Sequence, residues 1–150
     1  MILITFDPLD PEAVTRQVRD PRHGAVVTFL GTTRNETDGR RVLYLEYEGY
    51  IPMAQRKLAQ VIEEARQRFG VSQVAVAHRL GRLNIGEISL VVAVGSPHRR
   101  EAFSAIAYIV DRIKEDVPIW KKEVFADRAV WVGSGEALHV VTPASGPSSD

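Results

Sequence analysis

Three lysines surround one proline in the segment DRIKEDVPIWKKEVF. Lys114 lies one helical turn after Val110, so it borders the apolar stripe of a predicted helix. A lysine at such a border is partly desolvated, which lowers its pKa toward values useful for proton transfer. Lys121 and Lys122 follow on a predicted strand, where neighbouring side chains point to opposite faces. At most one of them therefore joins Lys114 in a pocket, and a set of solvated lysines is the alternative.

The segment SPHRR begins a long predicted helix and places His98 and Arg99 in its first turn. Ser96 suits the N-cap and Pro97 the first turn. Free N–H groups and the positive end of the helix dipole favour an anion there. Basic side chains are unfavourable at this end unless an anion joins them. The pattern indicates a phosphate or carboxylate site, or else a solvated basic pair on a helix end.

Arg34 lies in the polar loop GTTRNETDGRR, directly after a predicted buried strand. Loops at such positions often carry ligand-binding residues. An arginine can hold a phosphate through two parallel hydrogen bonds. A solvated loop arginine fits the sequence equally well.

The composition is that of an ordinary globular protein whose positive charge must be local. The chain has 150 residues, 45% hydrophobic and 25% charged, which suffices for one domain with a proper core. Lysine plus arginine and aspartate plus glutamate each total 19, so the formal net charge is zero. Proteins that bind nucleic acid or membranes generally carry a net basic surface, and we expect neither partner here.

Cysteine is absent from the sequence. Its absence excludes disulfides, thiolate metal sites, iron–sulfur clusters and cysteine nucleophiles. There is no phosphate loop and no dinucleotide-binding glycine motif, and the four histidines lack paired metal-ligand spacing. We therefore expect neither a metal nor a cofactor. His78 falls within an alternating strand pattern and is interpreted as a structural histidine.

The two ends of the chain indicate a single cytoplasmic domain. The N-terminal sequence MILITFDPLD has no basic segment before its apolar residues, unlike a signal peptide. No apolar run approaches the roughly 20 residues of a membrane span. One domain is predicted over residues 1–141. Residues 142–150 are rich in proline, serine and glycine and are predicted to form a disordered tail.

Strand and helix patterns mix along the chain and predict an α+β fold with two major helices packed on a mixed or antiparallel sheet. Helical spacing of apolar residues predicts one helix over 52–69 and another from Ser96 to Val117. A shorter helix, with Asp10 as its N-cap, is predicted to end near Arg19. Strands are predicted over 1–6, 24–30, 42–48, 71–80, 87–94, 119–125 and 129–132, with residues 83–86 as a connection.

Five segments occur in an order and spacing similar to those of one known family. They are GAVVTFLGTTRN, LEYEGYIPMA, HRLGRLNIGE, SPHRREAF and IKEDVPIWKKE, within residues 24–131. The chain resembles the MoaE family, the large, catalytic subunit of molybdopterin synthase. The resemblance implies a single α/β-hammerhead-type domain that forms a homodimer. It also implies a heterotetramer with two small ubiquitin-like sulfur-carrier subunits that end in Gly-Gly.

The resemblance implies that the chain is a sulfurtransferase of molybdenum cofactor biosynthesis. The carrier's C-terminal thiocarboxylate enters the pocket of the large subunit. Two sulfur transfers then convert cyclic pyranopterin monophosphate, also called precursor Z, into the dithiolene of molybdopterin. The composition agrees with this chemistry, because an enzyme without cysteine cannot carry the sulfur itself.

The resemblance also assigns residues. Lys114 matches the lysine nearest the carrier terminus, and Lys121 matches the second catalytic lysine. We hypothesise that Lys114 acts as an acid or base while the acyl–sulfur bond breaks, and that Lys121 steadies the substrate and the developing oxyanion. The matching substrate-binding residues are Thr32, Thr33, Arg34, His98, Arg99, Lys122 and Glu123.

One departure from the family is visible. Trp131 is followed by VGSGE, so an arginine that the family can supply across the dimer has no counterpart here.

Two other functions also fit the residues. A non-enzymatic regulatory module that binds a phosphorylated ligand needs Arg34, His98 and Arg99 but not Lys114. A structural dimerisation domain needs none of them. Conversion of precursor Z with a thiocarboxylated carrier separates the three functions.

Overall fold

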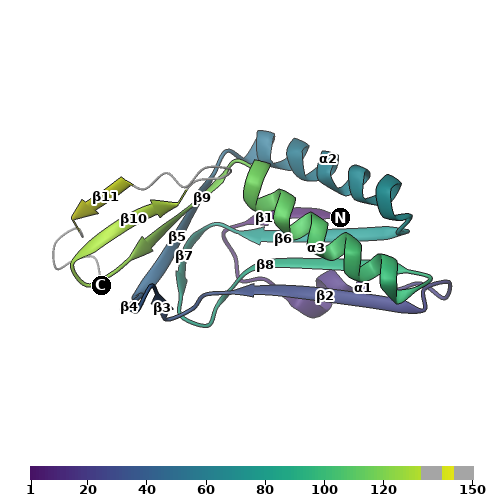
Figure 1. Ribbon diagram of the computed structural model, residues 1–150, viewed down its shortest axis with the longest axis horizontal. Coiled ribbons are helices and arrows are strands. Elements are labelled where there is room, and N and C mark those ends of the chain that lie inside the picture. Colours follow the sequence, from purple (N-terminus) through teal and green to yellow (C-terminus); the bar gives the residue numbers. More distant parts are fainter. Residues whose placement is uncertain (133–139, 144–150) are drawn as a thin grey trace.

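The computed structural model describes residues 1–132 and 140–143 and arranges most of their strands in two sheets (Figure 1). The first has the order β1-β6-β8-β2 and is mixed, because β1 runs parallel to β6 and the other pairs are antiparallel. Its strands are β1 (Ile2–Thr5), β2 (Ala25–Thr32), β6 (Gln73–Arg79) and β8 (Ile88–Ser96).

The second sheet is antiparallel and has the order β11-β10-β9-β5-β7. Its strands are β5 (Tyr44–Gly49), β7 (Gly81–Asn84), β9 (Ile119–Val124), β10 (Arg128–Val132) and β11 (Val140–Pro143). A small hairpin of β3 (Glu36–Thr37) and β4 (Arg40–Arg41) precedes β5. Its turn is Asp38-Gly39, both with positive φ, as the sequence predicts.

Helices cover both faces of the first sheet. The long helices α2 (Ile51–Phe69) and α3 (Arg99–Asp116) lie on one face, and the short α1 (Pro11–Arg16) lies on the other (Figure 1). Asp10 caps α1 as predicted, because its carboxylate accepts hydrogen bonds from two backbone N–H groups of the first turn. The predicted α+β class, with two major helices on a mixed sheet, is confirmed.

Alternation along β6 explains these layers. Val74 and Val76 pack into the core beneath the two long helices, while Ala75 and Ala77 face α1. The small alanines let the short helix approach the sheet closely enough to bury Val14. The main core therefore lies under α2 and α3.

The predicted N-cap of α3 is wrong. Ser96 is the last residue of β8, is only 1% exposed, and pairs with Ala25 across the ladder. The N-cap is instead His98, whose side chain makes no capping hydrogen bond, and Arg99 is the first helical residue. Strand pairing holds Ser96 in the sheet and overrides the capping preference of serine.

The predicted connection over residues 83–86 is incorrect for its first two residues. Gly81 takes a positive φ of 88° directly after β6, and the chain crosses there into the second sheet as β7. Leu83 on this strand is fully buried and pairs with Leu45. Ile85 and Gly86 form the turn after β7, as the sequence predicts.

The predicted start of the tail is incorrect for two residues. Thr142 and Pro143 belong to β11, where they pair with Ala129 and Arg128. The rest of the predicted tail, residues 144–150, lies outside the described residues, as do residues 133–136 of the VGSGE segment. No described helix has the length and apolar character needed to cross a membrane.

Candidate active site

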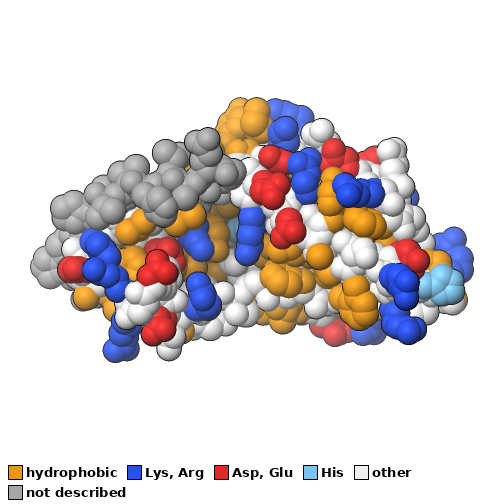
Figure 2. All heavy atoms as spheres, viewed as in Figure 1, with side chains coloured by type: hydrophobic (Ala, Val, Ile, Leu, Met, Phe, Trp, Pro, Cys, Tyr) orange, Lys and Arg blue, Asp and Glu red, His pale blue; other side chains and the backbone are white. Residues whose placement is uncertain are grey.

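A cavity of about 480 Å³ lies between the two sheets and brings the predicted catalytic lysines together. Lys114 reaches it from the last turn of α3, Lys121 from β9, and Arg34 from the loop after β2. In Figure 2, Lys and Arg side chains border the hollow between the two halves of the molecule. Segments far apart in the sequence therefore place three cations around one space.

The turn after α3 explains how two of these cations meet. Val117 has left the helical conformation, and Pro118 leads directly into β9. In β9, Lys121 lies opposite Tyr47 of β5 and Glu123 lies opposite Leu45. All four side chains line the cavity, because residues two apart on a strand share a face with their cross-strand partners.

Lys122 points away from the cavity, as the alternation of β9 predicts. Its Nζ atom lies 2.8 Å from a carboxylate oxygen of Glu46 and 5.5 Å from the ring centroid of Trp131. This lysine is not among the residues that line the cavity. Lys122 was predicted to bind substrate together with Thr32, Arg34 and Glu123, but only the other three line the cavity.

The desolvated lysine is Lys121 rather than Lys114. Lys114 is exposed at the end of α3, so the expectation that it is partly desolvated is wrong. Burial is the largest influence on the pKa of Lys121 and lowers it. Glu123 opposes this effect, whereas the positive charges of Lys114 and Arg34 lower the pKa further. A larger fraction of Lys121 is therefore a neutral amine than for an ordinary lysine.

The two threonines before Arg34 differ in their placement. Thr32 lines the cavity, but Thr33 is only 3% exposed and does not. The amide and hydroxyl of Thr33 both donate to the carbonyl of Glu87, at 3.0 and 3.1 Å. Its own carbonyl accepts from the amide of Gly86 at 2.9 Å. Thr33 thus anchors the loop that presents Arg34.

Glu123 is a buried carboxylate on the cavity wall. It is 9% exposed, and its Oε2 atom accepts a hydrogen bond of 2.8 Å from the Thr37 hydroxyl. This contact ties the β3–β4 hairpin to β9. It leaves the carboxylate facing the same cavity as Lys121.

His98 and Arg99 lie in a separate hollow of about 750 Å³ at the start of α3. Lys114 stands near the other end of the same helix. The rise of about 1.5 Å per residue separates Arg99 from Lys114 by about 22 Å along the helix axis. Within one chain, the structure does not bring the predicted anion site and the lysines together.

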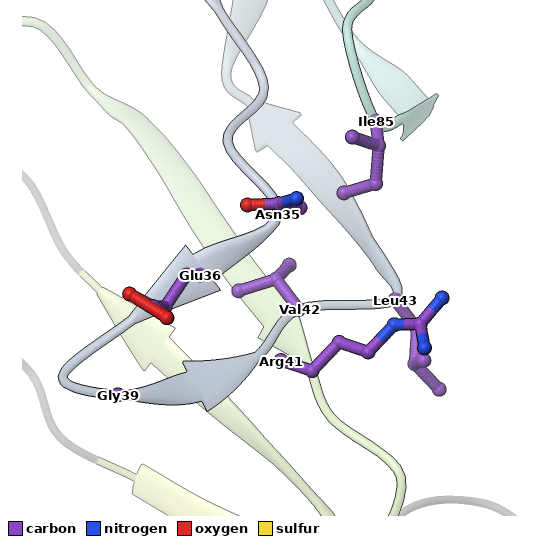
Figure 3. Close-up of a pocket in the computed structure, with 7 residues that line it drawn as sticks. All are labelled: Asn35, Glu36, Gly39, Arg41, Val42, Leu43 and Ile85. Carbon is purple, nitrogen blue, oxygen red and sulfur yellow. The ribbon is translucent and has the colours of Figure 1, made fainter.

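A third hollow, of about 530 Å³, lies beside the β3–β4 hairpin (Figure 3). Glu36, Arg41, Val42 and Ile85 are among its lining residues. It contains none of the predicted site residues. Among the residues that the structure describes, no group of three His, Asp or Glu side chains is placed to hold a metal ion.

The sequence interpretation missed four polar residues that line the main cavity: Thr37, Tyr47, His78 and Ser89. His78 is 5% exposed, and its Nδ1 atom lies 2.9 Å from the carbonyl of Arg79. Burial lowers the pKa of His78 to about 4, so the ring is neutral near pH 7. The alternating pattern correctly indicated a buried histidine but could not show that its ring reaches a cavity.

The buried neutral state of His78 predicts a loss of stability in acid. The unfolded histidine gains a proton near pH 6.5, whereas the folded one does so only near pH 4. The stability is therefore present above pH 6.5 and is lost as the pH falls through this window. We expect the free energy of unfolding to be about 2 kcal/mol lower at pH 5 than at pH 7 from this residue.

Urea denaturation at the two pH values checks this prediction. His78→Gln cannot titrate, so its unfolding free energy should change less between pH 7 and pH 5 than that of the wild type. An equal change in both proteins would show that another group causes the acid sensitivity.

The fold and the site together define an α+β protein with a cationic cavity between two sheets and no cysteine of its own. The family model described as MoaE protein matches residues 4–116. A molybdopterin synthase catalytic subunit from Halalkalibacterium halodurans is 48% identical over 130 residues, which cover 87% of this chain and 83% of that relative. The chain belongs to the MoaE family.

Solved structures agree with this assignment. Molybdopterin synthase from Staphylococcus aureus superposes with a TM-score of 0.84 at 43% identity, covering 87% of this chain and 96% of that chain. A complex of subunits 1 and 2 of the molybdopterin-converting factor from Helicobacter pylori has a TM-score of 0.70 over 93% of this chain and 89% of that chain. At 20% identity, the second structure supports the fold alone. The resemblance found in the sequence is confirmed, and the chain is an enzyme of molybdenum cofactor biosynthesis, a sulfurtransferase like its relatives.

Proposed function

We propose that this chain transfers sulfur from the C-terminal thiocarboxylate of a small ubiquitin-like carrier subunit to cyclic pyranopterin monophosphate. The observation that carries the proposal is the convergence of Arg34, Lys114 and Lys121 on one cavity. The thiocarboxylate and the substrate phosphate are both anions, and fixed cations in a partly buried site stabilise them strongly. The sulfur must arrive on a partner, because the chain has no cysteine.

The proposed reaction has two parts for each sulfur atom. The thiocarboxylate sulfur forms a bond to a side-chain carbon of the substrate as a C–O bond at that carbon breaks, and the displaced oxygen stays on the phosphate in one transfer and leaves as water in the other. Water then cleaves the acyl–sulfur bond. The sulfur stays on the substrate, and the carrier leaves with a carboxylate whose new oxygen comes from water. Two such transfers, from two carrier molecules, complete the dithiolene of molybdopterin.

The burial of the two lysines suggests a division of labour between them. Lys121, whose pKa burial lowers, is the group that we propose for proton transfer during cleavage of the acyl–sulfur bond. The exposed Lys114 stands at the opening and is proposed to hold the carrier terminus and the charge that develops there. The sequence hypothesis gave proton transfer to Lys114, and the burial of Lys121 is our reason for reversing the two roles.

The remaining cavity residues are proposed to bind the substrate. Arg34 is suited to the phosphate, because a guanidinium offers two parallel hydrogen bonds. Thr32 and Glu123 line the same space and offer a hydroxyl and a carboxylate. Thr33 acts indirectly, by holding the loop of Arg34 against Glu87.

His98 and Arg99 can serve this substrate only from a second copy of the chain. About 22 Å of helix separates them from Lys114 within one copy, which is too far for a single small substrate. We therefore propose a homodimer in which the start of α3 in one copy approaches the cavity of the other. With one carrier bound at each cavity, the assembly is a heterotetramer.

A two-subunit enzyme is in keeping with the Helicobacter pylori neighbour, which is a complex of two converting-factor subunits. The exposed position of Lys114 also suits a donor that arrives from outside the chain. Lys122 lies on the opposite face of β9 and is proposed as a peripheral contact that supports Trp131 and Glu46.

Reconstitution tests the proposed function. The purified chain is mixed with a thiocarboxylated carrier and cyclic pyranopterin monophosphate, and molybdopterin is measured by fluorescence of its oxidised derivative. We expect product only when all three components are present. No product at saturating carrier and substrate would reject the proposed function.

A further inference from the structure

The main cavity has two chemically different sets of polar side chains. The cations Arg34, Lys114 and Lys121 supply hydrogen-bond donors and positive charge. The other set includes His78, Ser89 and Glu123, and the hydrogen bonds that their protons make within the protein decide what they offer a ligand.

The neutral His78 ring uses its one N–H proton in a hydrogen bond within the protein. A backbone carbonyl can only accept, so Nδ1 must carry the proton in its 2.9 Å contact with the carbonyl of Arg79. The neutral ring then has a bare lone pair on Nε2. Since the imidazole lines the cavity, Nε2 is the acceptor that His78 offers to a bound molecule.

The proton of Ser89 is used in the same way. The Ser89 hydroxyl lies 3.2 Å from the carbonyl of Gly31 and must donate to it. The Tyr47 ring packs edge-on against His78, with ring centroids 5.1 Å apart, which fixes both rings.

Glu123 completes this set as a carboxylate, which carries no proton to donate. One of its oxygens already accepts from Thr37. His78, Ser89 and Glu123 therefore offer lone pairs to the cavity and no free proton. We call these three residues the acceptor wall.

A ligand that fits this cavity needs N–H donors for the acceptor wall as well as anionic or electrophilic groups for the cations. We propose that the acceptor wall binds the donor edge of the substrate's pterin ring, with His78 as a specificity-determining residue that accepts from it through Nε2. The inference rests on the proposed function, because it takes its substrate to be a pterin. It orients the ring so that the amino group and ring N–H groups face His78 and the reacting side-chain carbons face the lysines.

A pair of pteridine probes tests this orientation without the carrier. 6-Carboxypterin has an amino group at position 2, and 6-carboxylumazine has an oxygen there, which replaces a donor by an acceptor. We expect the wild-type chain to bind the pterin about 10- to 100-fold more tightly, because the oxygen would face lone pairs that it cannot satisfy. Equal affinities of the wild type for the two probes would overturn the proposal.

Variants of His78 show whether this residue causes the preference for the pterin probe. His78→Phe keeps a ring against Tyr47 but loses the acceptor, so the preference for the pterin should fall about tenfold. His78→Gln retains a carbonyl oxygen and should keep part of the preference. Tyr108→Phe, which changes a tyrosine on α3 outside the cavity, is the control and should keep all of it. A folded His78→Phe protein with the wild-type preference would overturn the role of His78. If that variant does not fold, the wild-type preference in a folded His78→Leu protein, which also lacks the acceptor, would do so.

Turnover separates this inference from the proposed function. With carrier and precursor Z, His78→Phe should raise KM for the pterin about tenfold or more while kcat stays within about threefold. If the wild type makes product but does not distinguish the probes, the inference fails and the proposed function stands. If it prefers the pterin but makes no product, the proposed function fails and the pterin-binding wall stands.

Discussion

Lys121→Ala is expected to lower kcat by about 10²- to 10⁴-fold while KM for the pterin changes only a few-fold. The reason is that Lys121 is the half-buried amine of the cavity, and its lowered pKa makes the neutral form available for proton transfer. Removal of a group that acts mainly in the transition state reduces kcat rather than binding. Single-turnover kinetics with preloaded carrier and substrate measures this effect directly.

Lys121→Arg and Lys57→Ala are the informative controls. Arginine keeps the positive charge but does not release its proton near neutral pH, so Lys121→Arg should remain impaired. Lys57 lies on α2 and does not line the cavity, so Lys57→Ala should leave kcat unchanged. Full activity of Lys121→Arg would contradict a proton-transfer role and would leave charge as the only requirement.

Lys114→Ala is expected to lower the rate of sulfur transfer by about 10²- to 10³-fold. Lys114 is exposed at the opening of the cavity, and its proposed role is to hold the anionic carrier terminus and stabilise charge as the acyl–sulfur bond breaks. The measurement is the rate at which thiocarboxylated carrier is consumed in a single turnover.

Arginine substitution should distinguish the two lysines. A role based on charge is retained by Lys114→Arg, so this variant should recover much of the activity that Lys114→Ala loses. Equal recovery by arginine at both positions would contradict the division of labour between Lys114 and Lys121. Full turnover by a folded Lys114→Ala protein that binds the carrier would remove the proposed role of Lys114.

Local patterns in the sequence predicted where several side chains of the candidate site lie. The period of two along β9 placed Lys121 and Lys122 on opposite faces, and Lys122 indeed pairs with Glu46 outside the cavity. The position of Arg34 after a strand predicted a ligand-facing loop residue, and Arg34 lines the cavity. These features depend on near neighbours along the chain, which is why sequence patterns can show them.

Features that depend on the meeting of the two sheets could not be predicted in the same way. His78 shows only as a buried position in a strand, and nothing local indicates that its ring packs against Tyr47 of β5 beside a cavity. Lys121 is likewise partly buried in the cavity between the two sheets, whereas Lys114 is exposed although its helix is well packed. The sequence therefore identified both lysines but assigned desolvation to the wrong one.

Competition between the local preference of a residue and long-range strand pairing explains the errors in the element boundaries. Ser96 has the chemistry of an N-cap, but pairing with Ala25 extends β8 through it and moves the cap to His98. Leu83 and Asn84 were predicted to lie in a connection, but pairing with Leu45 and Tyr44 of β5 makes them part of β7. In both places, long-range pairing outweighs the preference of a single residue.

The most direct test of the account follows the sulfur atoms by mass spectrometry during one turnover. The chain is mixed with thiocarboxylated carrier and precursor Z, and the intact masses of both proteins are recorded together with the product. We expect two carrier molecules to exchange sulfur for oxygen for each molybdopterin formed, and the mass of the chain itself to stay unchanged because it has no cysteine. Product formed without loss of carrier sulfur, or sulfur bound covalently to the chain, would contradict the account.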